Sequence, residues 1–381
     1  GSPERIKEVA KLIRNEKTNG NKIVVVVSAM GGTTDTLVNL AKEISTKPHP
    51  REYDALVSTG ENVSAALLAM CLQDLGTKAL SLTGHQVGIK TEKSHSKAKI
   101  LHIATDRISK ELEDDNVVIV TGFQGINENN DTTTIGRGGS DTSAVALAAA
   151  LKCKVCEIYT DVNGIYTTDP RVVPEAKKLD EISYDEMLEL ASLGAKVLHP
   201  RSVECAKENN IELHVRSSFN PEIGTFVKER KNMEIFKPVT GIALNEKEAI
   251  ISIHKIPDQP GVAGQIFSRL AEKAINVDMI IQSSHEEIYN DISFTVNEED
   301  LDEAITFTKD ICEELGGGSV SSDASISKVS IVGVGMISKP GIAARMFKQL
   351  GEGSINIKMI STSRSEEHTS ELQSPCNLVC R

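Results

Sequence analysis

Tryptophan is absent from this chain of 381 residues, and all aromatic residues together make up only 3% of it. Few rings are therefore available to stack on nucleic-acid bases. Positive charge is also scarce, because 42 lysines and arginines face 54 aspartates and glutamates, for a net charge of −12. Such a surface neutralises few phosphates, so we expect no nucleic-acid partner. No apolar run approaches the roughly 20 residues that cross a bilayer, and we expect no membrane partner.

The cysteines of this chain do not indicate a disulfide framework. The seven cysteines form an odd and scattered set, which is typical of reduced thiols in a cytoplasmic protein. Cys153 and Cys156 form a lone C-x-x-C inside an expected strand, and no second pair completes a zinc site. We therefore predict no bound metal and no redox role for this motif. The length of the chain predicts two or three domains.

Up to about residue 220, short β-branched runs alternate with longer helical patterns. The run I-V-V-V-V at 23–27 is typical of a parallel strand buried on both faces. Strands that alternate with helices predict an α/β fold, a parallel sheet with helices on its faces. We expect strands at Ile23–Val27, Ala79–Leu82, Val117–Val120, Val155–Tyr159 and Ile211–Val215, and helices at Thr36–Ser45, Ser64–Leu75, Lys97–Glu113, Thr142–Leu151 and Tyr184–Ala191.

The most informative stretch is T-I-G-R-G-G-S-D-T-S-A-V-A-L-A-A-A-L, at 134–151. Its glycines indicate a turn, and the alanine-rich run that follows indicates a helix. Ser140, Asp141 and Thr142 stand where N-cap residues are favoured. The N–H groups of a helix N-terminus attract anions, and Arg137 adds a fork that matches a carboxylate or phosphate. The stretch therefore predicts an anion site, although a glycine-rich turn without a ligand would have the same pattern.

Three further loops follow expected strands and are rich in glycine, serine and threonine. They are S-A-M-G-G-T-T-D at 28–35, T-G-F-Q-G at 121–125 and T-D-V-N-G-I-Y-T-T-D-P-R at 160–171. Ligands of parallel α/β sheets bind beyond the carboxyl ends of the strands. Several such loops at one edge favour a small-molecule site over isolated turns.

An internal repeat begins after about residue 236. The segment D-Q-P-G-V-A-G-Q-I-F-S-R-L at 258–270 recurs as S-K-P-G-I-A-A-R-M-F-K-Q-L at 338–350, an offset of 80 residues. Each copy has the pattern of a strand, a Pro-Gly turn, an amphipathic helix and a second strand. Two copies that pack side by side predict two small α+β modules, at 240–320 and 325–363.

The end of the chain does not continue this repeat. Pro375 falls opposite Thr295 at the same offset, and proline is excluded from strand interiors. We therefore expect the second module to be incomplete. The tail Arg364–Arg381 resembles a translated cloning adaptor, and we interpret it as non-native.

Five motifs together closely resemble the aspartokinase family. They are V-V-V-S-A-M-G-G-T-T-D at 25–35, S-T-G-E at 58–61, G-R-G-G-S-D-T-S-A at 136–144, Y-T-D-V-N-G-I-Y-T-T-D-P-R at 159–171 and L-G-A-K-V-L-H-P-R-S at 193–202. The repeat is similar to the paired ACT modules of that family, so the resemblance extends from Gly1 to about Ser363. It implies an amino-acid-kinase domain at 1–235, a three-layer αβα sandwich with a mostly parallel sheet, followed by two ferredoxin-like ACT modules.

The resemblance also implies a reaction. Aspartokinases use ATP and Mg²⁺ to phosphorylate the side-chain carboxylate of L-aspartate to 4-phospho-L-aspartate, the first step of lysine, threonine and methionine biosynthesis. Phosphoryl transfer depends mainly on alignment and charge stabilisation. The β-carboxylate is already a competent nucleophile at neutral pH, so we expect no strong general base. Lysine, threonine or both are the implied effectors, bound by the ACT modules of a homo-oligomer.

The resemblance carries site residues over motif by motif. L-Aspartate is expected at Ser28, Thr34, Glu61, Arg137 and Ser140, where Arg137 suits the α-carboxylate and Glu61 the ammonium group. The nucleotide is expected at Thr160, Asp161, Tyr166, Arg171, Lys196 and Val197. The expected catalytic set is Asp141, Arg137 and Lys196, with Asp141 organising the lysines or Mg²⁺. Effector contacts are expected at Asp258, Pro260, Gly261, Val262, Ala263, Asn276, Asp278, Gln282, Ile342, Ala343 and Asn356.

Simpler interpretations stay open for several of these residues. Glu61 fits a capping carboxylate at the start of a helix, and T-T-D-P-R fits an ordinary Asp-Pro turn. His199 fits a packing or capping residue better than a catalytic one. Kinases that act on glutamate or acetylglutamate lack paired ACT modules, so the repeat disfavours them. A non-catalytic amino-acid-sensing subunit is the alternative from another class.

One family feature is not seen in this sequence. Aspartokinases begin with a strand that ends in Lys-Phe-Gly-Gly and contacts the phosphates, whereas this chain starts at G-S-P-E-R-I-K. We therefore expect the chain as given to have strongly reduced or no kinase activity. Near-normal ADP release from aspartate and MgATP would contradict this expectation. The incomplete second module likewise weakens the expectation of effector binding.

Overall fold

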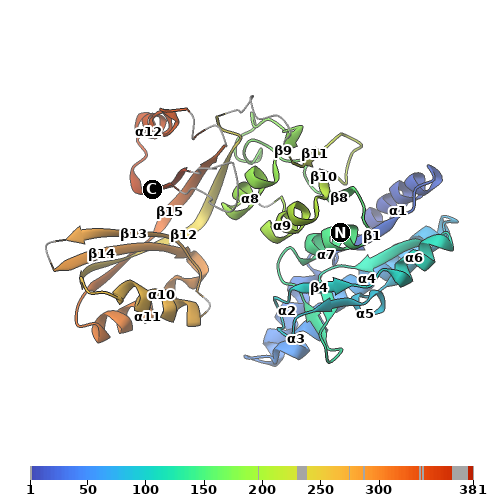
Figure 1. Cartoon of the computed structure of the whole chain (residues 1–381), viewed down its shortest axis with the longest axis horizontal. Helices are drawn as coiled ribbons and strands as arrows, with labels where there is room; N and C mark the ends of the chain where they lie inside the picture. The colour runs from blue at the N-terminus through green and yellow to red at the C-terminus, as the bar shows by residue number, and fades with distance from the viewer. Residues whose placement is uncertain are drawn as a thin grey trace. The chain divides into compact units, whose positions relative to one another are not determined.

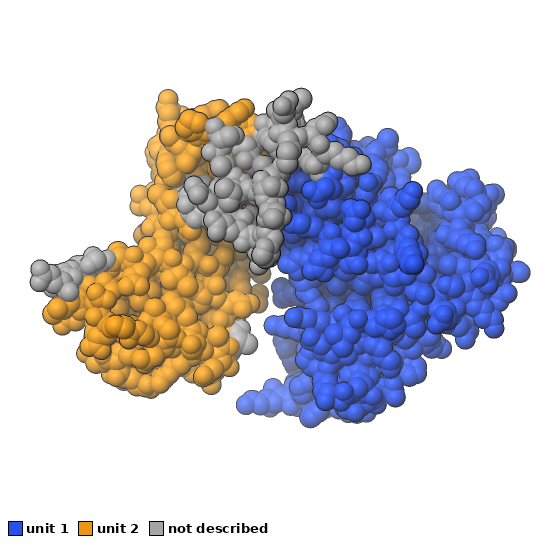
Figure 2. All heavy atoms as spheres, viewed as in Figure 1, with its two compact units in different colours: residues 1–165, 178–192, 196–231 blue, residues 166–177, 193–195, 232–381 orange. Residues whose placement is uncertain are grey.

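The computed structural model describes residues 2–195, 197–229, 238–273, 275–285, 288–333, 336, 339–362 and 376–380. The chain divides into two compact units (Figure 2). The expected kinase domain at 1–235 differs from unit 1 by three short segments, 166–177, 193–195 and 232–235, that belong to unit 2. Both copies of the repeat lie in unit 2. Unit 1 comprises Gly1–Ile165, Lys178–Ser192 and Lys196–Lys231, and unit 2 comprises Tyr166–Lys177, Leu193–Ala195 and Asn232–Arg381.

A parallel sheet of order β1-β5-β2 forms the centre of unit 1 (Figure 1). Continuous apolar runs suit such strands, because helices cover both faces. α1 (Pro3–Thr18) and α4 (Thr59–Asp74) supply the core on one face. α6 (Asp106–Glu113) and α7 (Gly139–Ala150) supply the core on the other, which gives three layers. The strands are β1 (Val24–Val27), β5 (Val117–Thr121) and β2 (Ala79–Leu82), as the sequence predicts.

Two four-stranded sheets hold the other strands of unit 1. In the sheet of order β8-β10-β11-β9, β8 (Val155–Thr160) and β10 (Glu212–Ser217) are parallel. The five expected parallel strands are therefore present, but they lie in two sheets rather than one, and α7 contacts both β1 and β8. The third sheet has the order β4-β3-β6-β7. The shorter strands are β3 (Ile89–Thr91), β4 (Ile100–Ile103), β6 (Gln124–Ile126), β7 (Thr132–Thr134), β9 (Glu181–Ile182) and β11 (Thr225–Val227).

The helix expected at 97–113 is wrong in its first half. Residues 100–103 form β4 instead, which pairs antiparallel with β3 and places Ile103 opposite Ile89. The pairing with β3 outweighs a weak local preference for helix. Only the second half of the expected helix exists, as α6. The remaining helices of unit 1 are α2 (Thr33–Ile44), α3 (Pro50–Val57), α5 (Gly84–Val87), α8 (Tyr184–Ser192) and α9 (Pro200–Asn209).

α3 and α4 together run from Pro50 to Asp74 with an apolar window of hydropathy 1.4. By length and composition alone, such a stretch could cross a membrane. Half of that window is buried inside the unit, where Leu68 and Leu72 pack with α1 and the central sheet. We therefore interpret this pair as core helices of unit 1.

Unit 2 is built on a sheet of order β13-β14-β12-β15-β17-β16 (Figure 1). α10 (Val262–Glu272) and α11 (Leu301–Glu314) cover one face of its first half, where Ile266 and Phe294 are fully buried. The two copies of the repeat match element by element, from β12 through α10 to β13 and from β15 through α12 (Ile342–Glu352) to β16. This confirms the predicted pair of α+β modules. The strands are β12 (Gly241–Pro257), β13 (Val277–His285), β14 (Tyr289–Asn297), β15 (Ser319–Val332), β16 (Ile357–Thr362) and β17 (Cys376–Cys380), and a short 3₁₀ helix spans Glu298–Asp300.

Part of the tail takes a place in this sheet that the repeat does not predict. β17 lies between β15 and β16, antiparallel to both, as β14 lies between β12 and β13. In the sequence, Pro375 directly precedes this strand, and a proline is tolerated there but not in a strand interior. The structure therefore differs from the expectation for residues 376–380. The origin of the tail stays a prediction.

Candidate active site

Glu61 places a buried carboxylate at the carboxyl end of the central sheet. It lies in the first turn of α4, and only 4% of the residue is exposed. Its Oε1 accepts a hydrogen bond from the N–H of Ala29 at 3.1 Å, whereas its Oε2 is buried without a partner in the described part of the chain. Burial raises the pKa of Glu61, and the Ala29 N–H opposes this only in part. A buried, half-satisfied carboxylate is suited to bind a cationic group.

The loop after β1 packs closely against the start of α4. A Cβ on Gly60 would lie 2.8 Å from an atom of that loop, so this close approach requires glycine. Gly32, with a φ of 76°, is the N-cap of α2 and brings Thr34 into the first turn of that helix. Ser28 is exposed at the start of the loop, and Thr34 is half-buried. Three residues expected to bind aspartate, Ser28, Thr34 and Glu61, thus lie on this loop or on the helix that packs against it.

The glycine-rich stretch opens α7 at Gly139, three residues earlier than expected. The N-cap is Gly138, in the left-handed region with a φ of 67°, and it provides no side-chain cap. Ser140, Asp141 and Thr142 therefore lie in the first turn rather than at the N-cap. His199 accounts for the glycine, because a Cβ on Gly138 would lie 2.2 Å from the Cβ of His199.

Ser140 reaches the central sheet through Gly122. The N–H of Gly122, just after β5, donates to the carbonyl of Val27 at the end of β1, at 3.0 Å. A Cβ on Gly122 would lie 2.8 Å from the Oγ of Ser140. The start of α7 therefore lies at the carboxyl ends of β1 and β5, the edge at which ligands of parallel sheets bind. Glu61 meets the loop that follows β1 at the same edge.

Arg137 and Asp141 bring opposite charges to the start of α7. Arg137 is exposed, and its guanidinium has no hydrogen-bond or ion-pair partner in the described part of the chain. Burial raises the pKa of Asp141 to about 6. A cation that approached Asp141 would favour its ionised form. The two groups therefore suit a site for charged ligands.

Part of the expected nucleotide site lies in unit 1. Thr160 ends β8, and its hydroxyl donates to the carboxylate of Asp161 at 3.1 Å. The carbonyl of Thr160 accepts from the N–H of Ser218, beyond β10, at 2.9 Å. Val197 is half-buried ahead of α9. Lys196, expected in both the nucleotide site and the catalytic set, lies outside the described residues.

Tyr166 and Arg171, the other two residues expected at the nucleotide, belong to unit 2. Tyr166 is half-buried, and the exposed Arg171 forms an ion pair with Asp169 at 2.8 Å. Their role in nucleotide binding stays a prediction.

His199 has a structural place in unit 1. It is the N-cap of α9, and its Nδ1 accepts from the N–H of Arg201 at 3.3 Å. Burial lowers the pKa of His199, which favours the neutral ring that such a cap requires. Its contact with Gly138 adds tight packing. The interpretation of His199 as a packing and capping residue is confirmed.

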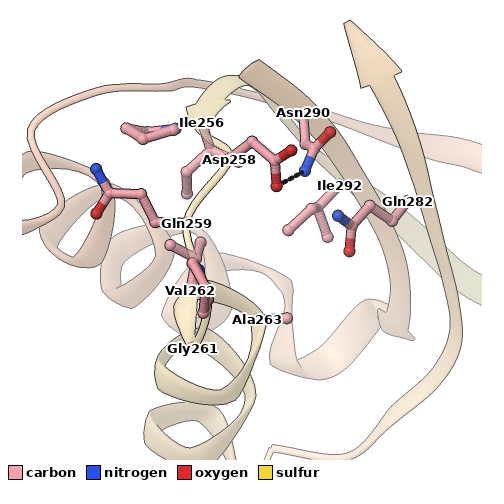
Figure 3. Close-up of a pocket in the computed structure, with 11 residues that line it drawn as sticks. Ile256, Asp258, Gln259, Gly261, Val262, Ala263, Gln282, Asn290 and Ile292 are labelled. Atoms are coloured by element: carbon pink, nitrogen blue, oxygen red, sulfur yellow. Dashed lines mark hydrogen bonds between the residues drawn. The ribbon is translucent and has the colours of Figure 1, made fainter. Parts of the chain in front are cut away.

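A pocket of about 460 Å³ opens in unit 2 at the start of α10 (Figure 3). Gly261, with a φ of 95°, is the N-cap of this helix. Asp258 and Asn290 point toward one another, and the Asn290 amide donates to the Asp258 carboxylate at 2.8 Å (Figure 3). Val262 and Ile292 add apolar surface. A carboxylate, an amide and a helix N-terminus around one pocket can bind the charged groups of a small molecule.

Six of the expected effector residues line this pocket, and five do not. Asp278 contacts Lys328 instead, and Asn276 is exposed at the loop before β13. The other three belong to the second copy of the repeat. Asn290 and Ile292 line the pocket but were missed, although their spacing of two on an alternating strand indicates a shared face. The six are Asp258, Pro260, Gly261, Val262, Ala263 and Gln282, and the three of the second copy are Ile342, Ala343 and Asn356.

Comparisons with known proteins match this architecture. The model of the amino acid kinase family matches residues 1–217, and that of the ACT domain matches 251–308 and 329–370. An aspartokinase of Geobacillus stearothermophilus is 53% identical over 363 residues, which are 95% of this chain and 88% of that protein. The solved aspartate kinase from Synechocystis is 47% identical, with a TM-score of 0.56 over 99% of this chain and 64% of that chain.

Escherichia coli aspartokinase III gives two further structural matches, each over 98% of this chain and 92% of that chain. Its complex with aspartate and ADP has a TM-score of 0.78 at 26% identity. Its complex with lysine and aspartate has a TM-score of 0.73 at 27% identity.

The fold and the site define an amino acid kinase with C-terminal ACT domains. This confirms the predicted fold class. Sequence identity of 53% over nearly the whole chain narrows the class further. The chain belongs to the aspartokinase family.

Proposed function

We propose that the site of this chain serves the ATP-dependent phosphorylation of the side-chain carboxylate of L-aspartate to 4-phospho-L-aspartate, the reaction of its family. The observation that carries this proposal is Glu61, whose Oε2 is buried and without a partner in the described part of the chain. The ammonium group of an amino acid would supply the missing donors and the missing charge. The family comparison supports the same substrate, because aspartokinase III binds aspartate.

Arg137 gives the aspartate site its second charge. Its exposed guanidinium offers a planar fork for the α-carboxylate. Hydroxyl groups of Ser28, Thr34 and Ser140 complete the polar lining. An anion and a cation at the two ends of the site select an amino acid by its backbone groups and leave the β-carboxylate for the reaction.

The nucleotide would lie at the ends of β8 and β10, with Thr160, Asp161 and Val197 from unit 1. Tyr166, Arg171 and Lys196 are the further groups proposed for the adenine and the phosphates. Mg²⁺ is usually held by one or two carboxylates together with phosphates and water, and Asp141 fits that requirement. When bound, the ion would neutralise charge on the phosphoryl group that is transferred. Asp141, Arg137 and Lys196 form the proposed catalytic set.

Calorimetric titration with L-aspartate tests the substrate proposal. We expect L-aspartate to bind and L-glutamate to bind at least tenfold more weakly, because the extra methylene of glutamate carries its side-chain carboxylate beyond the position that the β-carboxylate of aspartate reaches. Glu61→Gln removes the charge at constant shape, and we expect it to weaken binding roughly 10- to 100-fold. Glu43→Gln, on the exposed face of α2, is the matched control. Undiminished aspartate binding by Glu61→Gln would reject the proposal.

We further propose that the pocket at α10 binds the effector, lysine or threonine. Asp258 would receive the ammonium group, and the N-terminus of α10 the carboxylate. Gln282 and Asn290 line the same pocket and would select the side chain. Aspartokinase III also binds lysine. The ACT modules would join copies of the chain into a homo-oligomer in the cytoplasm.

Titration with lysine and with threonine tests the effector proposal. We expect heat from one or both, and a loss of at least tenfold in affinity in Asp258→Asn. Asp302→Asn, exposed on α11, is the control and should leave the affinity unchanged. Absence of heat from both amino acids would reject effector binding by this chain.

A further inference from the structure

Asp54 is a buried carboxylate that neither proposed ligand site uses. It lies on α3 and is 0% exposed. Its Oδ2 accepts from the N–H of Ser96 at 2.9 Å, from the N–H of Thr134 at 3.0 Å and from Nδ1 of His95 at 2.9 Å. Its Oδ1 accepts from the Thr134 hydroxyl at 2.7 Å. Two chain segments far from α3 in the sequence therefore meet at this one side chain.

Thr134 and Ile135 lie directly before Gly136 and Arg137, and their main-chain groups are fully bound. The N–H of Thr134 donates to Asp54, and its carbonyl accepts from the N–H of Ala98 at 2.9 Å. Thr134 therefore has little freedom to move unless its hydrogen bonds to Asp54 break.

Arg201 holds the next residue from the other side. Its Nη1 donates to the carbonyl of Ile135 at 2.6 Å, and its Nη2 donates to the carbonyl of Ala98 at 3.1 Å. The N–H of Ile135 donates to the carbonyl of Phe123 at 2.9 Å. Arg137 therefore follows, after one intervening residue, the dipeptide Thr134–Ile135, whose main-chain N–H and carbonyl groups are all hydrogen-bonded.

Asp54 is also tied to Glu61. α3 ends at Val57 and α4 begins at Thr59, so Glu61 follows Asp54 within two turns of nearly continuous helix. Ser96, which Asp54 holds through its N–H, has a φ of 67°, a conformation that a non-glycine residue keeps only when its surroundings impose it. The contacts of Asp54 thus fix the helix pair of Glu61 to the segment that leads to Arg137.

We propose that Asp54 is a positioning residue, whose buried carboxylate sets the spacing of Glu61 and Arg137 and so the fit of the amino-acid substrate. This inference rests on the aspartate site proposed above. Substrate-binding groups must be held close to their productive geometry, and a loop residue such as Arg137 depends on its supports for that. Arg201 supports the same segment from α9.

Asp54→Asn is the direct test, because it keeps the shape but turns one accepting oxygen into an NH₂ group. That group cannot accept from the N–H of Ser96 or Thr134. We expect the Kd of L-aspartate to rise about tenfold and the Kd of MgADP to change less than twofold. An equal rise for both ligands, or no rise for either, would overturn the proposal. Thr134→Val removes only one hydroxyl donor and should give a smaller change in the same direction, even if Asp54→Asn folds poorly.

Asp131→Asn is the matched control. Asp131 also links α3 to the β6–β7 hairpin, through Arg51 Nε at 2.7 Å, but that ion pair is partly exposed, with 51% of the Arg51 side chain accessible. Exposed pairs of this kind contribute little. We expect no change in either Kd. A loss in Asp131→Asn equal to that in Asp54→Asn would contradict the role of the buried carboxylate.

Amide hydrogen exchange gives a second readout that does not depend on ligand. In Asp54→Asn, we expect exchange to be at least tenfold faster at 134–137 and 96–98 and unchanged in β5. Uniformly faster exchange throughout unit 1 would show a general loss of stability and reject positioning. Absence of aspartate binding by the unaltered chain would reject the proposed aspartate site, whereas the exchange data would still decide whether Asp54 holds the Arg137 segment.

Discussion

Glu248 and Lys328 occupy equivalent positions in the two copies of the repeat, and they form a buried ion pair with one another. Oε1 of Glu248 lies 3.2 Å from Nζ of Lys328, and their side chains are only 4% and 3% exposed. The pair joins β12 and β15, the adjacent central strands of unit 2. Lys328 also contacts Asp278, and the Asn245 amide donates to Glu248 at 2.8 Å.

This pair distinguishes the two modules from one another. If two first modules met through the same strand, two carboxylates would be buried together, and two second modules would bury two ammonium groups. Like charges placed together in this way cost several kcal/mol. The charges of Glu248 and Lys328 therefore favour the pairing of a first module with a second. The hydrogen-bond register of β12 and β15 favours the same pairing.

Lys328→Met should destabilise unit 2 strongly. Burial raises the pKa of Glu248 even with Lys328 beside it, so removal of the lysine leaves a carboxylate with little compensation. We expect a loss of about 3–5 kcal/mol in the free energy of unfolding. Adding Glu248→Gln, which removes the orphaned charge, should restore most of it. Urea unfolding followed by circular dichroism measures both.

Lys358→Met is the control for that experiment. Lys358 is paired with Asp323 at 3.6 Å, and the two side chains are partly exposed. We expect a loss below about 1 kcal/mol. Wild-type stability in Lys328→Met, or equal losses in the two variants, would contradict the importance of the buried pair.

Asp141 should make the protein less stable at neutral than at acidic pH. Its pKa of about 6 in the folded state exceeds the ordinary 3.8, so the folded state binds the proton more tightly than the unfolded state. Protonated Asp141 costs the folded state nothing, so this contribution to the free energy of unfolding is fully present below the ordinary pKa of 3.8. It is lost as the pH rises to about 6, where Asp141 must ionise in its buried place. Asp141→Asn removes this loss, and we expect a gain on the order of 1–3 kcal/mol at pH 7.

Thermal unfolding of both proteins between about pH 4 and pH 8 checks the sign. The advantage of Asp141→Asn should grow up to about pH 6.5 and then stay constant. Asp106→Asn, exposed in the first turn of α6, should show no such growth. An advantage that does not depend on pH would reject burial of the Asp141 charge as its cause.

The affinity for L-aspartate should fall at mildly acidic pH. Burial raises the pKa of Glu61, and the ammonium of the ligand requires the ionised carboxylate. As the pH drops through that raised pKa, the fraction of Glu61 able to bind decreases, and the Kd should rise by up to about tenfold per pH unit. Calorimetry from about pH 7.5 to pH 5 measures this. Glu61→Gln should give a weaker and flatter profile, and parallel profiles would contradict the role of Glu61.

The sequence predicts where the parallel strands of unit 1 lie better than it predicts which strands pair with one another. A strand covered on both faces requires a continuous apolar run, so β1 and β5 could be identified locally. Pairing depends on long-range contacts, and the sequence does not show that β8 pairs with β10 in a separate sheet. β4 was mistaken for helix because its main-chain partner, β3, determines its conformation.

The site could be predicted only where a residue carries its own signal. Glu61 and Arg137 stand in motifs, and parallel strands bring such loops to one edge. Asp54 belongs to none of the family motifs, and its partners Ser96 and Thr134 are 42 and 80 residues away. Nothing local indicates that these residues meet. Burial and hydrogen bonding, which only the fold determines, make Asp54 informative.

Gly138→Ala should lower the free energy of unfolding by more than the backbone strain of a left-handed alanine alone. Gly20 also has a positive φ, of 89°, but nothing lies within 4 Å of a Cβ placed there. Gly20→Ala therefore measures backbone strain alone, about 1 kcal/mol. At Gly138 the new Cβ would lie 2.2 Å from the Cβ of His199, so α7 or α9 must shift as well. We expect a loss of roughly 2–4 kcal/mol.

His199→Ala should rescue Gly138→Ala only in part. It removes the Cγ and Cδ2 of His199, which would lie 2.3 and 2.8 Å from the new Cβ, but it keeps the Cβ at 2.2 Å. His199→Gly removes all three atoms, and both substitutions lose the α9 cap that the His199 ring provides. In urea unfolding, the double variant Gly138→Ala/His199→Gly should therefore be more stable than Gly138→Ala/His199→Ala. Equal losses in Gly138→Ala and Gly20→Ala would show that the start of α7 yields to α9 without cost, and that the close packing of Gly138 on His199 does not fix where the helix begins.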